Sequence, residues 1–202
     1  MSSAKLERWN AAGILAVIAG VALWPATGAA QTVNGQAAAV QATVVGLFGN
    51  TVLGLANTGT LSGPNDAREA SQLTGNLLGA LTAEVPQAAT MGLGDQVDSQ
   101  ASLANLALSI AGSNIGADFL IAQATAALGG VRSGSASVTN LSLNGVPIAV
   151  TGDPNQILAI PGGTIVINEQ QASPAGMVVN ALHVIVGGVA DVVIGSATAG
   201  IQ

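Results

Sequence analysis

Short runs in which apolar and polar residues alternate recur along this chain, and segments rich in glycine, asparagine and serine separate them. In Ser102–Ala111, every second residue from Ala104 to Ile110 is apolar, which is the pattern of a strand with one buried face. Many short strands joined by turns are typical of an all-β sandwich or closed barrel. We therefore predict an all-β, single-domain fold: an antiparallel β-sandwich or barrel built from repeated hairpins, with at most one short helix.

One hairpin unit occurs at least twice in the sequence. The decamer ADFLIAQATA at Ala117–Ala126 closely resembles ADVVIGSATA at Ala190–Ala199. Each decamer follows a strand-like run and a turn that contains glycine. We therefore expect equivalent hairpins at 101–128 and 178–201.

The clearest single hairpin is Ser137–Val150, in which Asn144-Gly145 separates two alternating runs. The Asn-Gly pair favours a type I′ turn, because both residues tolerate a positive φ. The first arm, ASVTNLSL, echoes ASLANLAL of the first repeat, and an asparagine recurs at the same point. Such strand asparagines are expected to bond the backbone or one another, as in a ladder of stacked amides: Asn105, Asn140 and Asn180.

One segment has a helical pattern instead. Asp66 would cap a helix over Asp66–Leu81, and Glu69 stands three residues later, as in a capping box. Two glycines inside the segment disfavour that helix. The competing interpretation is a strand within Leu78–Met91, where Pro86 would require a sheet edge or a bulge.

The first thirty residues have the order of a secretory signal peptide. Lys5 and Arg8 precede the apolar run Ala11–Leu23, and the small residues Gly28-Ala29-Ala30 follow it. This order predicts a cleaved leader over 1–30 and an all-β domain over 31–202; an uncleaved amphipathic anchor is the alternative. We therefore expect a protein that is secreted, extracellular or at the cell surface, with no stable membrane insertion after cleavage.

The start of the domain is predicted to be irregular. Gln31–Gln36 is expected to be mobile, with a turn at Asn34-Gly35. Two strands are expected in Ala37–Leu55, broken at Gly49-Asn50, and Phe48 belongs to the apolar surface that they would share.

The composition excludes several kinds of partner. Without the leader, the chain keeps nine acidic residues but only two basic ones, Arg68 and Arg132. It cannot neutralise a phosphate backbone, so we expect no nucleic acid partner. The absence of cysteine removes disulfides and thiolate chemistry. Only 7% of the residues are charged, and such weak electrostatic repulsion favours self-association.

The polar residues do not form a recognisable active site. His183 is the only histidine, on a face that we predict it to share with Val179, Ala181 and Ile185. It would be either a general base or a hydrogen-bonded strand residue, and no nucleophile motif supports the first. We therefore predict no enzyme and no catalytic residue.

Two pairs of aspartates are candidates for metal binding or for turn formation. Asp95 and Asp98 are candidate calcium ligands, but calcium needs six to eight oxygen ligands, so a solvated loop without metal is the preferred interpretation and no cofactor is expected. Asp118 and Asp191 are expected to bond backbone N–H groups near their turns.

Several motifs in fixed order resemble the choice-of-anchor P family of exported bacterial proteins. They are ASVTNLSLNGVPI, GDPNQ, PGGTIVINEQ, VVNALHVIV and ADVVIGSATAGI, and the resemblance covers about Thr82 to Ile201. It implies a secreted or surface-displayed domain and carries no catalytic assignment. The last residues, Gly200-Ile201-Gln202, contain no LPxTG, apolar span or basic tail, so covalent anchoring is not expected.

Taken together, the sequence predicts a secreted, non-enzymatic structural or surface protein. Its partner is expected to be itself, in oligomers or filaments that form by β-strand pairing through the N-terminal segment 31–45 or the C-terminal strand 191–201. The residues expected to take part are Val40, Val44, Asp191, Val193 and Ile201.

The alternative is a monomeric extracellular binding module that uses the loops Asn57–Asp66 and Gly92–Gln100 for a surface ligand or partner. A hydrolase that uses His183 is the third and least supported hypothesis.

Overall fold

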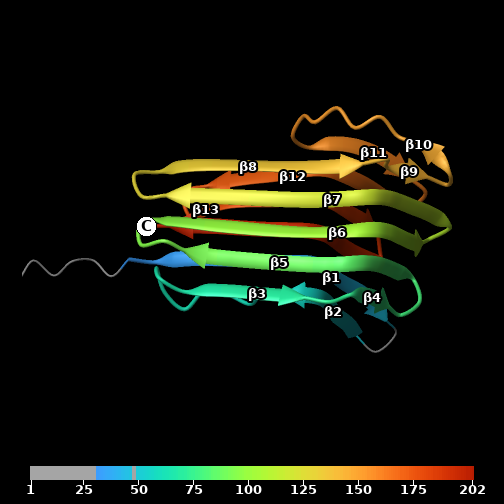
Figure 1. Cartoon of the computed structure of the whole chain (residues 1–202). Helices are drawn as coiled ribbons and strands as arrows, with labels where there is room; N and C mark the ends of the chain where they lie inside the picture. Colours follow the sequence, from blue (N-terminus) through green and yellow to red (C-terminus); the bar gives the residue numbers. More distant parts are fainter. Residues whose placement is uncertain (1–30, 47–48) are drawn as a thin grey trace, which may run out of the picture. The chain divides into compact units, whose positions relative to one another are not determined.

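The computed structural model describes residues 31–46 and 49–202. Within these ranges every regular element is a β-strand and there is no helix. The strands form two antiparallel sheets that pack face to face without closing on each other (Figure 1). The predicted all-β sandwich is therefore confirmed. Neither described range contains a helix long and apolar enough to cross a membrane.

We call the two layers sheet A and sheet B. Sheet A has the order β11 (Gln156–Ile160), β12 (Gly163–Ser173), β13 (Gly176–Val186), β14 (Ala190–Ile201), β1 (Val33–Gly46), β2 (Gly49–Asn57). Sheet B has the order β10 (Val146–Pro147), β9 (Ser142–Leu143), β7 (Ser113–Ala127), β6 (Gln96–Ile110), β5 (Leu81–Gly92), β3 (Ala67–Ser71); in addition β4 (Thr74–Leu77) pairs with β5 and β8 (Val131–Thr139) with β7.

Aliphatic side chains from both sheets form the core between them. Alanines are frequent there, since their small side chains allow the two sheets to pack closely. The largest fully buried residues include Ile165, Ile167, Leu182 and Ile194 of sheet A and Leu81, Leu103, Ile115 and Leu120 of sheet B.

The repeated units occupy the interior of the two sheets. The first forms the β6–β7 hairpin in sheet B, and the second forms the β13–β14 hairpin in sheet A. In Figure 1, β6 and β7 lie in the near layer, and β13 is visible behind them. The chain therefore uses similar sequences to build the centre of each layer.

In both repeated hairpins the alternation of buried and exposed residues changes phase at one point, although the register of the hairpin is continuous there. In sheet B, Ala104 pairs with Phe119 and Leu106 with Ala117, so Asn105 stands opposite Asp118, and Asn105 has a φ of 47°. In sheet A, the change falls at Gly195, which stands opposite Ala181 and has a φ of 63°.

Two predicted faces are wrong for this reason. Leu106 is buried whereas Ala104 is only half-buried, because the phase change at Asn105 lies between them. Val179 points into the core, but His183 lies on the outer face of the same strand with Ile185. Where the two-residue alternation of a strand is broken, every side chain beyond that point lies on the face opposite to the one that the sequence pattern predicts.

Other local predictions also had mixed outcomes. The helix over Asp66–Leu81 is wrong: β3 and β4 occupy this segment and pair with β5. The strand interpretation is confirmed by β5, whose register shifts next to Pro86. Its proline therefore stands at an irregularity of the ladder, as a residue without an N–H must.

Turn predictions divide in the same way. The Asn144-Gly145 turn is confirmed, with φ values of 52° and 77°, although its arms β9 and β10 are only two residues long. Asn34-Gly35 is not a turn but part of β1, paired with β14. The predicted leader 1–30 and the prediction for Phe48 lie outside the described residues.

Candidate functional site

The five residues predicted to take part in assembly lie on two strands that pair with each other. Val40 is opposite Ile194, Val44 is opposite Ala190, and Ile201 is opposite Val33. β14 lies between β13 and β1, and β1 lies between β14 and β2. Within one chain, each of these two strands is therefore hydrogen-bonded on both sides.

The five side chains divide between the two faces of sheet A. Val40 and Ile201 are buried, and Val44 is half-buried against the core. Asp191 is exposed and Val193 is half-buried, and both lie in the strand phase that faces outward. All five residues therefore lie on paired strands, but their side chains do not form one surface.

β1 holds its place mainly through its backbone and small side chains. Its buried positions include Ala37, Ala39 and Ala42, beside a single large one, Val40. At Gly35, a Cβ would lie 2.5 Å from Leu61 Cδ1 and 2.6 Å from Thr90 Oγ1. Since no larger side chain fits there, β1 approaches sheet B closely at this point and contributes little apolar volume for its length.

His183 lies between two carboxylates on the outer face of sheet A. Its Nδ1 is 2.9 Å from Glu169 Oε2 of β12, and its Nε2 is 2.9 Å from Asp191 Oδ1 of β14. Asn180 Nδ2 donates a further hydrogen bond of 2.6 Å to Glu169 Oε2. The three strands β12, β13 and β14 are neighbours, so the sheet itself assembles this cluster.

The geometry of the cluster favours a structural role. The two carboxylates occupy opposite ring nitrogens, so they cannot chelate one ion together with the imidazole. No hydrogen bond joins His183 to a hydroxyl in the described parts of the chain, as a serine triad would require. Burial alone would raise the pKa of Glu169, but hydrogen bonds from Asn180, Gln171 and His183 lower it.

The repeated asparagines each donate to a carboxylate of another segment. Asn105 Nδ2 lies 2.6 Å from Glu84 Oε2, and Asn140 Nδ2 lies 2.7 Å from Asp118 Oδ2. Together with the Asn180–Glu169 pair, they correct the prediction that these amides bond the backbone or one another. They also correct the roles of Asp118 and Asp191, which accept side-chain hydrogen bonds from Asn140 and His183.

Asp95 and Asp98 are not arranged as a ligand pair. Asp98 lies on β6, and its two carboxylate oxygens accept hydrogen bonds from Thr125 and Gln96. Asp95 lies in the β5–β6 turn, where its carbonyl accepts from the N–H of Leu128. Over the ranges that the structure describes, no cluster of three or more His, Asp or Glu residues is suited to a metal ion.

The two loops predicted for the alternative binding module meet at one end of the sandwich. The N–H of Gly94 donates to the carbonyl of Pro64 at 2.7 Å, and that of Gly92 donates to the carbonyl of Asp66 at 2.8 Å. The second loop is shorter than predicted, because β6 begins at Gln96.

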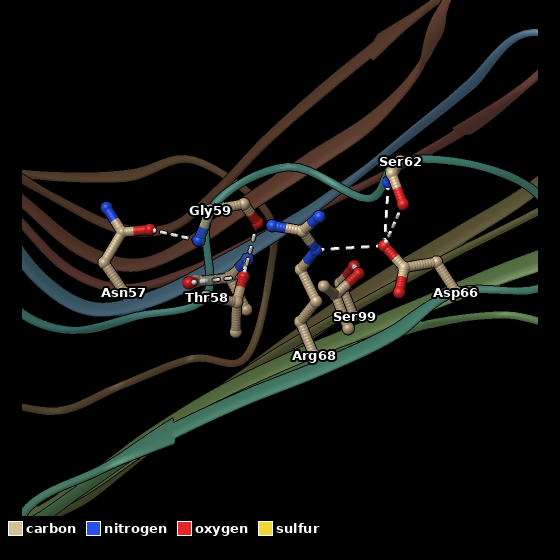
Figure 2. Close-up of polar contacts among 9 residues, drawn as sticks. Asn57, Thr58, Gly59, Ser62, Asp66, Arg68 and Ser99 are labelled. Carbon is tan, nitrogen blue, oxygen red and sulfur yellow. Dashed lines mark hydrogen bonds and ion pairs between the residues drawn. The ribbon is translucent and has the colours of Figure 1, made fainter.

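Figure 2 shows how Asp66 organises the first loop. Its Oδ2 accepts from the N–H and the hydroxyl of Ser62, both at 2.8 Å, and from Arg68 Nε at 3.0 Å. The hydrogen bonds from Ser62, followed by that from Arg68, hold the pKa of Asp66 far below its ordinary range. Arg68, on β3, is therefore already paired with a carboxylate of the loop that precedes this strand.

No family model, curated protein or solved structure matches this chain. The resemblance to the choice-of-anchor P family therefore stays a prediction.

Proposed function

We propose that this chain is a secreted, non-enzymatic structural or surface protein of the choice-of-anchor P type, and that its copies assemble by exchanging β1. In an assembly of this kind, β1 of one copy occupies the place between β14 and β2 of another. Main-chain hydrogen bonds provide most of the affinity of such strand addition, and alternate side-chain pockets set the register.

The observation that carries this proposal is the position of β1. It is the first strand that the structure describes, yet it lies inside sheet A, between β14 and the edge strand β2, with eleven paired residues towards β14. A strand at the start of a domain can leave without threading through the rest of the fold. Its removal would expose the hydrogen-bonding edge of β14, and an unpaired edge of that length is an association surface.

The composition of β1 supports the same proposal. Its buried side chains are mostly alanines, so its departure exposes less apolar area than the departure of a strand such as β13 would. A hydrogen-bonded ladder that is identical within and between copies also makes the two arrangements nearly equal in energy, which is the usual basis of strand swapping.

Engineered cysteines test the exchange directly, since the natural chain has none. Gln41 on β1 and Val193 on β14 are register partners, and opposite residues of an antiparallel pair lie within disulfide range. Chains carrying Gln41→Cys and differently tagged chains carrying Val193→Cys are unfolded together in urea, refolded at high concentration and oxidised. We expect a covalent heterodimer.

The control uses the same design in sheet B. Gln100 and Gln123 are register partners on β6 and β7, strands joined by a tight turn inside the other sheet. Mixed Gln100→Cys and Gln123→Cys chains are expected to stay unlinked. If the Gln41 and Val193 chains also stay unlinked while a single chain carrying both cysteines forms the internal disulfide, β1 does not exchange and the proposal is wrong.

A monomeric binding module is the second candidate, because the loop 58–66 and the turn 93–95 meet in one surface. It predicts a monomer at every concentration and a loss of ligand binding when either loop is replaced.

A further inference from the structure

At one end of the sandwich the two sheets leave an open apolar cleft of about 260 Å³. It lies where β1 ends and β14 begins in sheet A, opposite the β4–β5 and β6–β7 turns of sheet B. None of the side chains that line it is charged. They include Val44 of β1, Leu53 of β2, Leu81 of β5, Leu108 of β6 and Val192 of β14.

Two of the large apolar side chains that line this cleft are open to solvent. Leu78 is 72% exposed, and Val189 is 43% exposed. The N–H of Val45 on β1 donates to the carbonyl of Val189 at 2.9 Å, so Val189 is tied to the end of β1. We call Leu78 and Val189 the apolar rim.

In an isolated molecule, Leu78 raises the free energy of the folded state in two ways. Its backbone has a φ of 52°, a left-handed conformation that suits glycine or asparagine and costs other residues free energy. Its side chain also exposes apolar surface to water. Strained residues persist where the surroundings require them, and burial against a second molecule would recover the apolar part of this cost.

The exchange of β1 determines which surface of a second copy meets this rim. β1 joins β2 at the cleft end, where Gly46 pairs with Gly49. If β1 extends outward from that end and fills the same place in a second copy, it must enter that copy from its cleft end. The two clefts therefore face each other across a two-fold axis, which is an isologous contact.

Electrostatics favours the same arrangement. Residues 31–202 carry nine acidic and two basic side chains, so two copies have the same sign of net charge and repel each other. The cleft has no charged lining. At the opposite end, by contrast, the exposed residues Leu93 and Val131 stand close in sequence to Asp95 and Arg132.

We infer that the cleft and its apolar rim are the contact surface for the same cleft of a second copy, in a closed dimer. This inference rests on the proposed exchange of β1 and makes the dimer the unit of any larger assembly. It assigns Leu78 an intermolecular role that its own chain does not explain.

Leu78→Asn tests the contact, because asparagine tolerates the left-handed backbone and removes the apolar side chain. The dissociation constant of the protein recovered after export is measured by sedimentation velocity over a concentration series. We expect dimerisation to weaken by roughly tenfold or more. The urea midpoint of the monomer, measured at low concentration, should stay equal or rise.

The matched control is Leu128→Asn, at an exposed leucine of the β7–β8 turn at the opposite end, which should leave the dissociation constant unchanged. A protein that stays monomeric at every concentration would overturn the inference. So would a dimer that Leu128→Asn weakens and Leu78→Asn does not, since the contact would then lie at the other end.

The cysteine experiment separates this inference from the proposed function. If the Gln41 and Val193 chains become linked but Leu78→Asn leaves dimerisation unchanged, β1 exchanges and the cleft contact is wrong. If the chains stay unlinked but Leu78→Asn weakens the dimer, the cleft contact stands and the exchange is wrong.

Discussion

The two similar decamers, Ala117–Ala126 in β7 and Ala190–Ala199 in β14, bury different residues. Their last halves agree: Ala124 and Ala197, at matching positions, are both buried. Their first halves do not. Ile194 is completely buried, whereas the matching Ile121 is half-buried on the outer phase of its strand.

The positions of the two phase changes explain this difference. In β7 the phase changes at Asp118, opposite Asn105 of β6, near the start of the decamer. In β14 it changes at Gly195, near the middle. Between these points the two strands are one residue out of phase, and a shift of one residue exchanges the two faces of a strand. Similar sequences therefore produce similar strands but not similar faces.

The largest effect is expected when each of the two matching isoleucines is replaced in turn. Ile194→Ala removes a buried side chain from the core and should lower the free energy of unfolding by about 4 kcal/mol, from lost burial and a cavity. Ile121→Ala removes a half-buried side chain and should cost about 1 kcal/mol. Urea unfolding of both variants measures the difference. Equal losses would mean that the two strands are in phase and that the assigned positions of the phase changes are wrong.

The second test concerns Gly195, the residue at which the phase changes in β14. Gly195 aligns with Ala122 of the other decamer, and a Cβ on Gly195 would lie 3.1 Å from Ala181 Cβ and 3.9 Å from Ala122 Cβ. Gly195→Val combines a positive φ with crowding and should cost about 3 kcal/mol in unfolding free energy. Ala122→Gly should cost about 1 kcal/mol. A valine variant as stable as the natural protein would contradict the left-handed geometry.

The class of fold was predictable because alternation and turn signals are local properties. The phase changes were not, since they fall at opposite residues of paired strands and so depend on the neighbouring strand. Asn105 and Asn180 both begin runs of alternating apolar residues, but only Asn105 has a positive φ. The helix predicted after Asp66 fails for a related reason: pairing with β5 outweighs a local capping pattern.

The polar contacts were the least predictable part. Glu169, His183 and Asp191 come from three strands, and no motif links their spacing to their contact. Knowledge of the hairpin register would have placed them together, but the phase change that turns His183 outward lies between it and Val179. The repeated asparagines were visible as a pattern, whereas their carboxylate partners depend on the same missing register.

The smallest effect is expected from a comparison of two carboxylates. Glu169 accepts a hydrogen bond from Asn180, and Glu84 accepts one from Asn105. Glu169 accepts from Asn180, Gln171 and His183, and its pKa lies below the ordinary value of 4.5. A carboxyl group with a lowered pKa in the folded state stabilises the fold above the unfolded-state pKa, and this contribution is lost as the pH falls through the folded-state value. Unfolding free energy should therefore decline below about pH 4.5, and Glu169→Gln should flatten part of that decline.

Glu84→Gln is the matched substitution in sheet B, where Glu84 accepts a single hydrogen bond from Asn105 on an exposed face. Because one exposed contact contributes little after solvent screening, this variant should follow the natural protein more closely from pH 6 to pH 3. Urea titrations across that interval measure both profiles. If Glu84→Gln flattens the acid side of the stability profile as much as Glu169→Gln does, the additional donors Gln171 and His183 add nothing to the stabilisation of Glu169. The two asparagine–carboxylate pairs are then energetically equivalent despite their different surroundings.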